Sequence, residues 1–250
     1  MIWLIVPFSR PNFLRNVIAN FRRLEFNDKK LLLVCNGDAE GFSTDEGVVI
    51  ESENGVAEPM NAGLEYIRKH GKGSDWFCKF DDDDLYLEKY LNGPLEAQSK
   101  GARFGGQLAA WMKTTDNKLW FIDGPQNEWG TEGAHGPTLF GSIDCIDFPH
   151  VDKWGEDALW YRGMASEFGS GWLTNANDFC WMRYKNHNHA FPFGDLAIAA
   201  TQTNHVVDCG EYNKALIKNS KPHNYEEIQF DLNKVAEDAF GFLGPVSLTV

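Results

Sequence analysis

The stretch WFCKFDDDDLYLEKYL, residues 76–91, decides how the rest of the sequence is interpreted. Its first five residues are mostly apolar and typical of a strand buried in a sheet. Four aspartates, Asp81 to Asp84, follow directly, and the apolar spacing after them predicts an amphipathic helix that begins near Tyr86. Four negative charges at the end of a buried strand need a physical reason.

A divalent cation supplies such a reason. Asp81 and Asp83 stand two residues apart, so their carboxylates leave the strand on the same side and repel each other unless a cation lies between them. Carboxylate oxygens favour Mg²⁺ or Mn²⁺, which usually bind one or two carboxylates together with substrate phosphates. Asp82 or Asp84 then suits a hydrogen bond to a ribose or sugar hydroxyl, and Asp84 also suits the cap of the following helix. The alternative is an acidic loop that only caps this helix.

The first 80 residues alternate strand and helix patterns. Short apolar runs predict strands over residues 2–6, where Pro7 ends the run, and over 31–35, 48–50 and 76–80, with a helix over 60–70. This order predicts an α/β fold with a mostly parallel central sheet flanked by helices. A small antiparallel element follows, with a hairpin over 104–112 and 118–122. We expect one domain over 1–210 and a C-terminal helical extension over 211–250 packed on the same domain.

Composition bounds the class of protein. The net charge is −13, which opposes nonspecific binding to a phosphate backbone. The five cysteines are widely spaced and form no CxxC pair, so we expect buried free thiols in a reducing compartment. No targeting segment and no membrane span is visible, and we therefore expect a cytoplasmic protein.

Several segments together resemble the family 2-type glycosyltransferases of the GT-A fold. They are IVPFSRPNFLRNVIANF, LLLVCNGD, MNAGLEYIRKHGKGSDWFCKFDDDDLYLEKYL and GEDALWYR, and the resemblance covers roughly residues 2–192. It implies a nucleotide-sugar-dependent transferase, with Asp81 and Asp83 as the Asp-x-Asp metal motif. The implied donor is a UDP-sugar, although Asn36 replaces the first acid of the family's base-binding turn.

The resemblance also implies residues that contact the nucleotide sugar. These are the end of the first strand, the acidic turn after the second strand, the Asn-x-Gly helix and the first two aspartates of the motif: Pro7, Phe8, Ser9, Arg10, Asn36, Asp38, Asn61, Gly63, Asp81 and Asp82.

Transfer also needs a proton acceptor for the acceptor hydroxyl. Asp157, with Glu156 beside it, resembles the family's catalytic base, and its place at a helix start favours the ionised carboxylate. His187 and His189 are equal candidates to complete the metal site. We also expect His135 and Gly136 to approach the donor sugar, and Trp154, Trp160 and Trp172 to line the acceptor cleft.

Other functions stay open. The acceptor is a glycan or another hydroxyl compound, and hydroxymethylated bases of phage DNA are an alternative that the acidic charge disfavours. That alternative would need a local basic patch, for which the candidates are Arg10, Arg15, Arg22, Arg23, Lys29 and Lys30. A non-catalytic module that binds carbohydrate or metal is an alternative of another class, although the EF-hand spacing is absent. A phosphotransferase is a further alternative, but the chain lacks a P-loop lysine motif.

Overall fold

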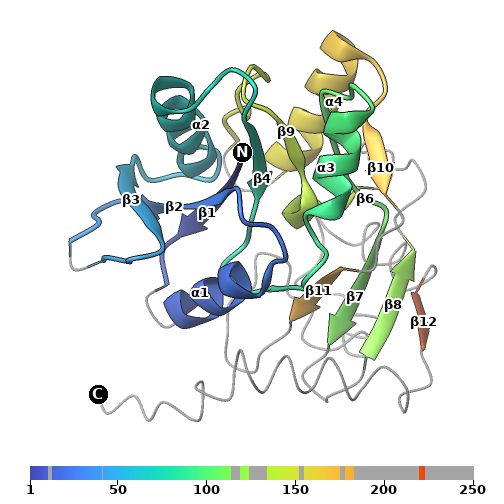
Figure 1. Cartoon of the computed structure of the whole chain (residues 1–250), viewed down its shortest axis with the longest axis horizontal. Helices are drawn as coiled ribbons and strands as arrows, with labels where there is room; N and C mark the ends of the chain where they lie inside the picture. The colour runs from blue at the N-terminus through green and yellow to red at the C-terminus, as the bar shows by residue number, and fades with distance from the viewer. Residues whose placement is uncertain are drawn as a thin grey trace.

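The computed structural model describes residues 1–10, 13–40, 42–113, 119–123, 134–151, 155–174, 178–182 and 220–222. Two sheets and four α-helices make up this part of the chain (Figure 1). The larger sheet has seven strands in the order β10-β6-β9-β4-β1-β2-β3. The smaller sheet has five strands in the order β12-β8-β7-β11-β5.

The elements have the following bounds. The strands are β1 (Ile2–Phe8), β2 (Lys29–Asn36), β3 (Gly47–Ser52), β4 (Trp76–Lys79), β5 (Leu85–Tyr86), β6 (Phe104–Gln107), β7 (Ala109–Lys113), β8 (Leu119–Asp123), β9 (Phe140–Ser142), β10 (Trp172–Thr174), β11 (Phe179–Met182) and β12 (Ser220–Pro222). The helices are α1 (Leu14–Arg23), α2 (Glu58–His70), α3 (Asn92–Ser99), α4 (Glu156–Phe168) and the 3-10 turn η2 (Gly136–Thr138).

The larger sheet is mostly parallel, as the sequence predicts. Strands β4, β1, β2 and β3 run parallel to one another, and β10 runs parallel to β6. Strand β9 lies antiparallel between β4 and β6. In the smaller sheet the pairs β7–β8, β8–β12 and β5–β11 are antiparallel, while β7 and β11 are parallel. The predicted fold class is therefore confirmed.

Side-chain alternation along the central strands builds a core on each face of the larger sheet. In β1, Leu4 and Val6 pack on the face covered by α1, whereas Trp3 and Ile5 pack on the face covered by α2 and α4. Figure 1 shows α1 and α2 on opposite sides of these strands. Both faces are apolar because parallel strands are covered by helices on both sides.

Strand β1 extends beyond the predicted end at Val6 and reaches Phe8, so Pro7 does not end the strand. Ile5 is the last residue of β1 that pairs with β4, opposite Lys79, whereas pairing with β2 continues to Phe8. Residues 5 and 7 direct their backbone groups to the same side of a strand. The N–H that Pro7 lacks would point toward β4, and β4 has already ended at that level. The proline therefore removes no hydrogen bond between the two strands.

The helix predicted to begin near Tyr86 is wrong. Leu85 and Tyr86 form the short strand β5, which pairs with β11, and the next helix is α3, which begins at Asn92. Tyr86 is fully buried, with its ring stacked on Phe80 at a centroid distance of 3.7 Å. Asp84 therefore does not cap a helix at this point.

The predicted domain boundary near residue 210 and the helical extension lie outside the described residues, except for β12. In the described part of the chain, no helix is long and apolar enough to cross a membrane. No disulfide joins the four cysteines in that part, Cys35, Cys78, Cys145 and Cys180, and all four are buried.

Candidate active site

The four aspartates form a turn between β4 and β5, at the carboxyl edge of the parallel strands, and we call residues 81–84 the acidic turn. Asp82, Asp83 and Asp84 are buried, and Asp81 is half-buried. A buried carboxylate is costly unless hydrogen bonds or opposite charges offset its lost hydration. Ligands bind at this edge in parallel α/β sheets.

Arg10 neutralises part of the acidic turn. It follows β1, the strand next to β4, and its Nε donates a hydrogen bond to Asp82 Oδ2 at 3.1 Å. A second guanidinium nitrogen of Arg10 contacts Asp82 Oδ1, so the pair is bidentate. Its third nitrogen lies 3.1 Å from Asp83 Oδ2. One arginine therefore links the β1 edge to two of the four aspartates.

Helix α1 fixes the backbone of the acidic turn. Asn16 Nδ2 donates to the carbonyl oxygens of Asp82 at 2.6 Å and of Asp84 at 3.0 Å. Asn20 Nδ2 donates to the Asp84 carbonyl at 2.9 Å, and both asparagines are fully buried. Because these bonds go to the backbone, the aspartate carboxylates are left for other partners.

Lys79 lies at the centre of a second set of charges, the Lys79 cluster, which consists of Lys79, Asp81, Glu156 and Asp157. Its ammonium donates a hydrogen bond to Asp157 Oδ2 at 2.6 Å. The same nitrogen lies 3.8 Å from Asp81 and 3.8 Å from Glu156. The cluster joins the end of β4 to the first turn of α4, so it brings together segments that are far apart in the sequence.

Burial and charge shift the pKa values of this cluster. Burial alone would lower the pKa of Lys79, but Asp157, Asp81 and Glu156 outweigh it and hold the pKa above its ordinary value. Burial raises the pKa of Asp157 to about 7, with a further increase from Glu156 that Lys79 opposes. Burial and the charge of Asp83 also raise the pKa of Asp81. Three carboxylates thus share one ammonium, and the surplus negative charge makes a further cation favourable.

The donor set fits a hard divalent cation. Asp81 and Asp83 follow the end of β4, and their carboxylates interact electrostatically. Within the described residues there is no group of three or more His, Cys, Asp or Glu side chains that could hold a metal by themselves. Two carboxylates agree with a Mg²⁺ or Mn²⁺ ion that takes its remaining ligands from water and from substrate phosphates. The candidate ligands His187 and His189 lie outside the described residues.

The predicted nucleotide contacts at the β1 and β2 ends have different surroundings. Phe8 is buried in the core against Phe42, with ring centroids 5.2 Å apart, while Pro7 is half-buried and Ser9 is exposed. Asn36 exchanges two hydrogen bonds with the backbone of Gly55, at 2.9 and 3.0 Å. Asp38 is exposed and accepts a hydrogen bond from Glu40 N at 2.7 Å.

The Asn-x-Gly motif on α2 has a structural role in this molecule. Asn61 exchanges hydrogen bonds with the backbone of Phe148, at 2.9 and 2.7 Å, and so ties α2 to the loop before α4. A Cβ on Gly63 would come within 2.6 Å of Ile5 Cγ2, so the glycine allows α2 to pack closely on β1.

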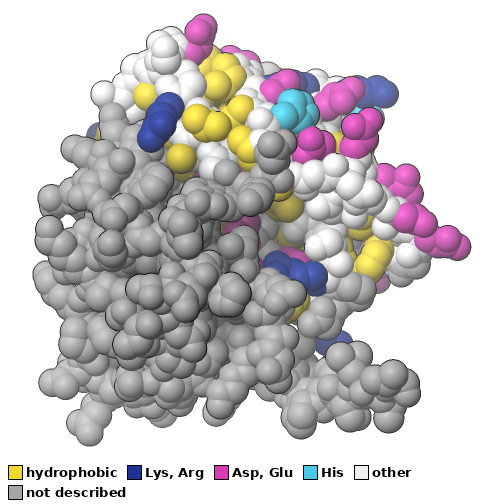
Figure 2. All heavy atoms as spheres, turned by 180° about the vertical axis from the view of Figure 1, so that it is seen from behind, with side chains coloured by type: hydrophobic (Ala, Val, Ile, Leu, Met, Phe, Trp, Pro, Cys, Tyr) yellow, Lys and Arg dark blue, Asp and Glu magenta, His cyan; other side chains and the backbone are white. Residues whose placement is uncertain are grey.

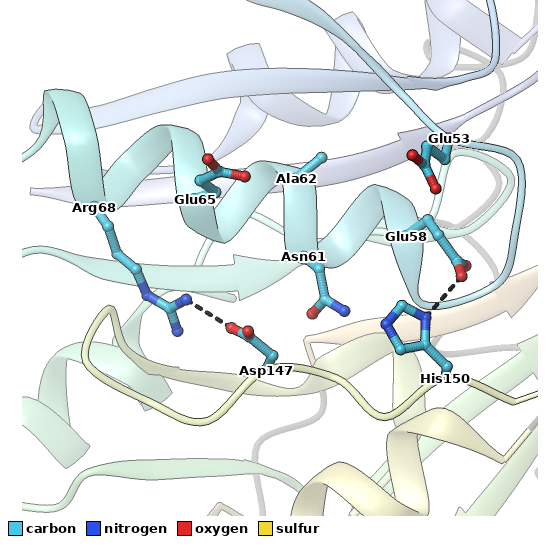
Figure 3. A pocket seen from close by; sticks show the side chains of 8 residues that line it. All are labelled: Glu53, Glu58, Asn61, Ala62, Glu65, Arg68, Asp147 and His150. Carbon is cyan, nitrogen blue, oxygen red and sulfur yellow. Dashed lines mark hydrogen bonds and ion pairs between the residues drawn. The ribbon is translucent and has the colours of Figure 1, made fainter.

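Asn61 also borders a surface pocket of about 410 Å³ on the outer side of α2 (Figure 3). Two contacts cross its rim, a hydrogen bond between His150 Nδ1 and Glu58 at 2.8 Å and an ion pair between Arg68 and Asp147 at 2.6 Å. Figure 2 shows acidic side chains and a histidine gathered on this part of the surface. None of the residues that line the pocket belongs to the Lys79 cluster.

Gly136 lies beside Asp157, whereas the ring of His135 packs near Trp181. Burial lowers the pKa of His135 to about 4, and its ring lies 5.1 Å from that of Trp181. A Cβ on Gly136 would come within 2.3 Å of Asp157 Oδ2. The expected wall of tryptophans is wrong for Trp160, which is fully buried and stacked on Phe148 in the core. Trp172 is half-buried in β10, and Trp154 lies outside the described residues.

Sequence reasoning missed three residues of this site. Lys79 is a lysine inside an apolar strand, which is a readable signal, because a buried ammonium needs carboxylate partners. Asn16 and Asn20 stand four residues apart on the apolar side of α1, next to Val17 and Phe21. Two asparagines on a buried helix face indicate backbone groups that need hydrogen bonds.

The sequence matches no family model and no curated protein. Residues 1–349 of S. aureus TarS have a similar structure, with a TM-score of 0.49 and 14% identity over 100% of this chain and 75% of that one. A longer S. aureus TarS structure gives 0.47 and 15% over 99% of this chain and 46% of that one. A mycobacterial protein gives 0.47 and 10% over 80% and 73% of the two chains. TM-scores and identities this low assign no function to this chain.

Proposed function

We propose that the chain is a metal-dependent inverting glycosyltransferase that moves a sugar from a nucleotide-diphosphate sugar to an acceptor hydroxyl. The observation that carries the proposal is the meeting of the acidic turn and the start of α4 around Lys79. Such an enzyme needs a cation site for the leaving diphosphate next to a proton acceptor for the nucleophile. The residues proposed for these two roles, the acidic turn and Asp157, meet at the sheet edge where α/β folds bind ligands, which supports the proposal.

Asp81 and Asp83 are the residues that would hold Mn²⁺ or Mg²⁺. When bound, the metal neutralises charge on the leaving diphosphate. Arg10 contacts Asp82 and Asp83 and would then lie beside that diphosphate, where its fixed charge also favours an anionic leaving group. The surplus negative charge of the Lys79 cluster supports the cation at this position.

Asp157 is the proposed base, with Glu156 beside it. It stands in the first turn of α4, and a pKa raised to about 7 suits a group that accepts a proton near neutral pH. A single base on the face of the sugar opposite the leaving group gives inversion at the anomeric carbon. The nucleotide is expected to lie over the ends of β1 and β2, near Ser9 and Asp38, with UDP as the expected diphosphate.

A glycan hydroxyl suits the acceptor better than DNA. Several of the basic residues that would form the patch needed by a DNA acceptor already pair with other groups of this molecule. Arg10 pairs with the acidic turn, Arg22 pairs with Glu46, and Lys29 donates hydrogen bonds to the carbonyls of Leu24 and Phe26. The net charge of −13 disfavours a polyanionic acceptor further.

A thermal-shift screen tests the proposal. The protein is heated with MnCl2 and one of UDP-glucose, UDP-galactose, UDP-N-acetylglucosamine, GDP-mannose or dTDP-glucose. A donor at 100 times its Kd adds about 2.7 kcal/mol to the free energy of unfolding. For a chain of this size, that raises the melting temperature by about 5–10 °C. We expect one nucleotide class to do so with Mn²⁺ and to lose the effect in Asp83→Asn.

Release of the nucleoside diphosphate from that donor then separates a transferase from a binding module. Wild type is expected to release it in the presence of Mn²⁺. Asp157→Asn should keep the thermal shift and lose roughly 100- to 10,000-fold in rate, the range that a general base supplies. A donor that stabilises the protein without any release would contradict the proposal and indicate a non-catalytic module. Absence of a shift with every nucleotide would contradict it as well.

A further inference from the structure

Lys79 is a buried lysine at the end of β4, the middle strand of the larger sheet. The strand sets the direction of its side chain. Along β4, Cys78 and Phe80 face the core under α1, and Phe77 faces the core under α2 and α4. Alternation therefore turns Lys79 toward α4. Its side chain is 8% exposed, and its ammonium is the partner nearest to Asp157.

The carboxylate of Asp157 is fixed from two sides at one oxygen. Oδ2 accepts the hydrogen bond from Lys79 at 2.6 Å. The same oxygen lies against Gly136, where a Cβ would come within 2.3 Å. Oδ1 is buried, and among the described residues no group hydrogen-bonds to it. The two oxygens of one carboxylate therefore have different surroundings.

We propose that Lys79 is a positioning residue that holds Asp157 Oδ2 and thereby fixes the orientation of the carboxylate that accepts the proton. This inference rests on the proposed glycosyl transfer. In that step the acceptor hydroxyl gives its proton to the Asp157 carboxylate, and the electron pair of its oxygen forms the bond to the anomeric carbon. The bond from that carbon to the diphosphate oxygen breaks, and its electron pair leaves with the nucleoside diphosphate. Lys79 keeps its proton throughout.

Gly136 also helps to hold the Asp157 carboxylate in one orientation. Its lack of a side chain allows the η2 turn to approach the carboxylate, so Lys79 and the turn enclose Oδ2 between them. A base held in one orientation reacts faster than one that rotates, and a displacement of about 1 Å can cost about 100-fold in rate. Gly136→Ala should therefore displace the Asp157 carboxylate even when Lys79 is unchanged.

Three variants test the inference: Lys79→Met, Lys79→Arg and Gly136→Ala. The assay measures nucleoside diphosphate release from the donor found in the thermal-shift screen, with Mn²⁺, and yields kcat and KM. Calorimetry measures the Kd of the nucleoside diphosphate with Mn²⁺. We expect Lys79→Met and Gly136→Ala to lower kcat by about 100-fold, with KM and Kd changed by about threefold or less. Lys79→Arg should restore part of kcat, because it keeps the charge but not the geometry.

Lys29→Met is the matched control. Lys29 also donates hydrogen bonds from a partly buried ammonium, to the carbonyls of Leu24 and Phe26, but it lies at the start of β2. Its kcat should stay within about twofold of wild type, because no charged group of the site contacts it. A loss of kcat in this variant as large as in Lys79→Met would point to a general effect of removing a lysine and would overturn the inference.

Other outcomes separate the inference from the function. If wild type turns over donor and both Lys79→Met and Gly136→Ala keep kcat within about threefold, Lys79 does not position the base. If Lys79→Met loses Mn²⁺–nucleotide affinity by the same factor as kcat, Lys79 acts on the donor site, and the inference is again wrong. If Lys79→Met does not fold, Lys79→Arg and Gly136→Ala decide. If wild type turns over no donor, the proposed function is wrong. This inference rests on that function and is then wrong as well.

Discussion

Asp75 illustrates how single residues of this chain hold a buried charge. Its carboxylate accepts hydrogen bonds from Trp3 Nε1 at 3.1 Å and from Lys72 N at 3.0 Å, and lies 3.5 Å from the amino group of Met1. Burial alone would raise the pKa of Asp75, but these partners outweigh burial and lower the pKa. Asp157 shows the opposite balance, because burial outweighs the hydrogen bond and the charge of Lys79 and raises the pKa to about 7.

Asp75→Asn should destabilise the protein in a pH-dependent way. A carboxyl whose pKa is depressed by folding stabilises the folded state above its unfolded pKa of about 4. That contribution is lost as the pH falls through the folded pKa. We expect urea unfolding at pH 7 to show a loss of about 1–3 kcal/mol for the variant, and the difference to shrink below pH 4. Asp45→Asn, at an exposed position, is the control. An equal loss at pH 3 and pH 7 would contradict this account.

The sequence predicted some residues of the candidate site and missed others for a physical reason. Asp81, Asp83 and Asp157 stand in short motifs, so the type of side chain and its neighbours in the sequence were enough to single them out. The partners Arg10–Asp82 and Lys79–Asp157 are far apart in the chain, and only the fold brings them together. Spacing cannot predict such pairs, because they depend on which strands are neighbours.

At the level of elements, α1 acts as a support for the acidic turn. The turn has no helix of its own after it, since β5 follows, and its carbonyl oxygens are bonded by Asn16 and Asn20 instead. Tyr86 of β5 adds a third anchor, because its hydroxyl accepts a hydrogen bond from Asp81 N at 2.7 Å and donates one to the Pro137 carbonyl at 3.1 Å. The turn is therefore held by three side chains from two elements, α1 and β5.

Asn16→Ala should weaken both the fold and the metal site. It removes the two buried hydrogen bonds from Asn16 to the turn and leaves the carbonyls of Asp82 and Asp84 with fewer partners, which costs about 1–3 kcal/mol in the free energy of unfolding. The turn should then hold Mn²⁺ with a nucleoside diphosphate less tightly, as measured by calorimetry. Asn27→Ala, an exposed asparagine after α1, is the matched control and should change neither quantity. Normal stability in Asn16→Ala would show that α1 does not support the turn.

The mistaken helix near Tyr86 has a cause at the same scale. Leu85, Tyr86, Tyr90 and Leu91 recur at spacings that fit one face of a helix. In the structure all four are buried, but Tyr86 and Tyr90 pack around Phe80, and Leu85 pairs with Cys180 of β11. A pattern of seven residues cannot distinguish a helix from a short strand followed by a turn, because the strand that pairs with β5 comes much later in the chain.

At the level of the whole molecule, the sequence predicted the parallel half of the larger sheet and the antiparallel element. Apolar runs with helices between them indicate parallel neighbours, so β1, β2, β3 and β4 could be anticipated. The sequence did not indicate that β9 would run antiparallel between β4 and β6, or that the chain would pass after Gln107 from β6 in the larger sheet to β7 in the smaller one. Both depend on pairing between distant segments. They also decide the site, because β9 follows the η2 turn that carries Gly136 to Asp157.

The most direct measurement is an anomalous difference map from a crystal soaked with MnCl2 and UDP. The account predicts a manganese peak at the carboxyl edge of β4, coordinated by Asp81 or Asp83 and by a diphosphate oxygen, with Asp157 facing the same cleft. A map with no manganese at the acidic turn, or with manganese only at the pocket of Glu58 and His150, would contradict it.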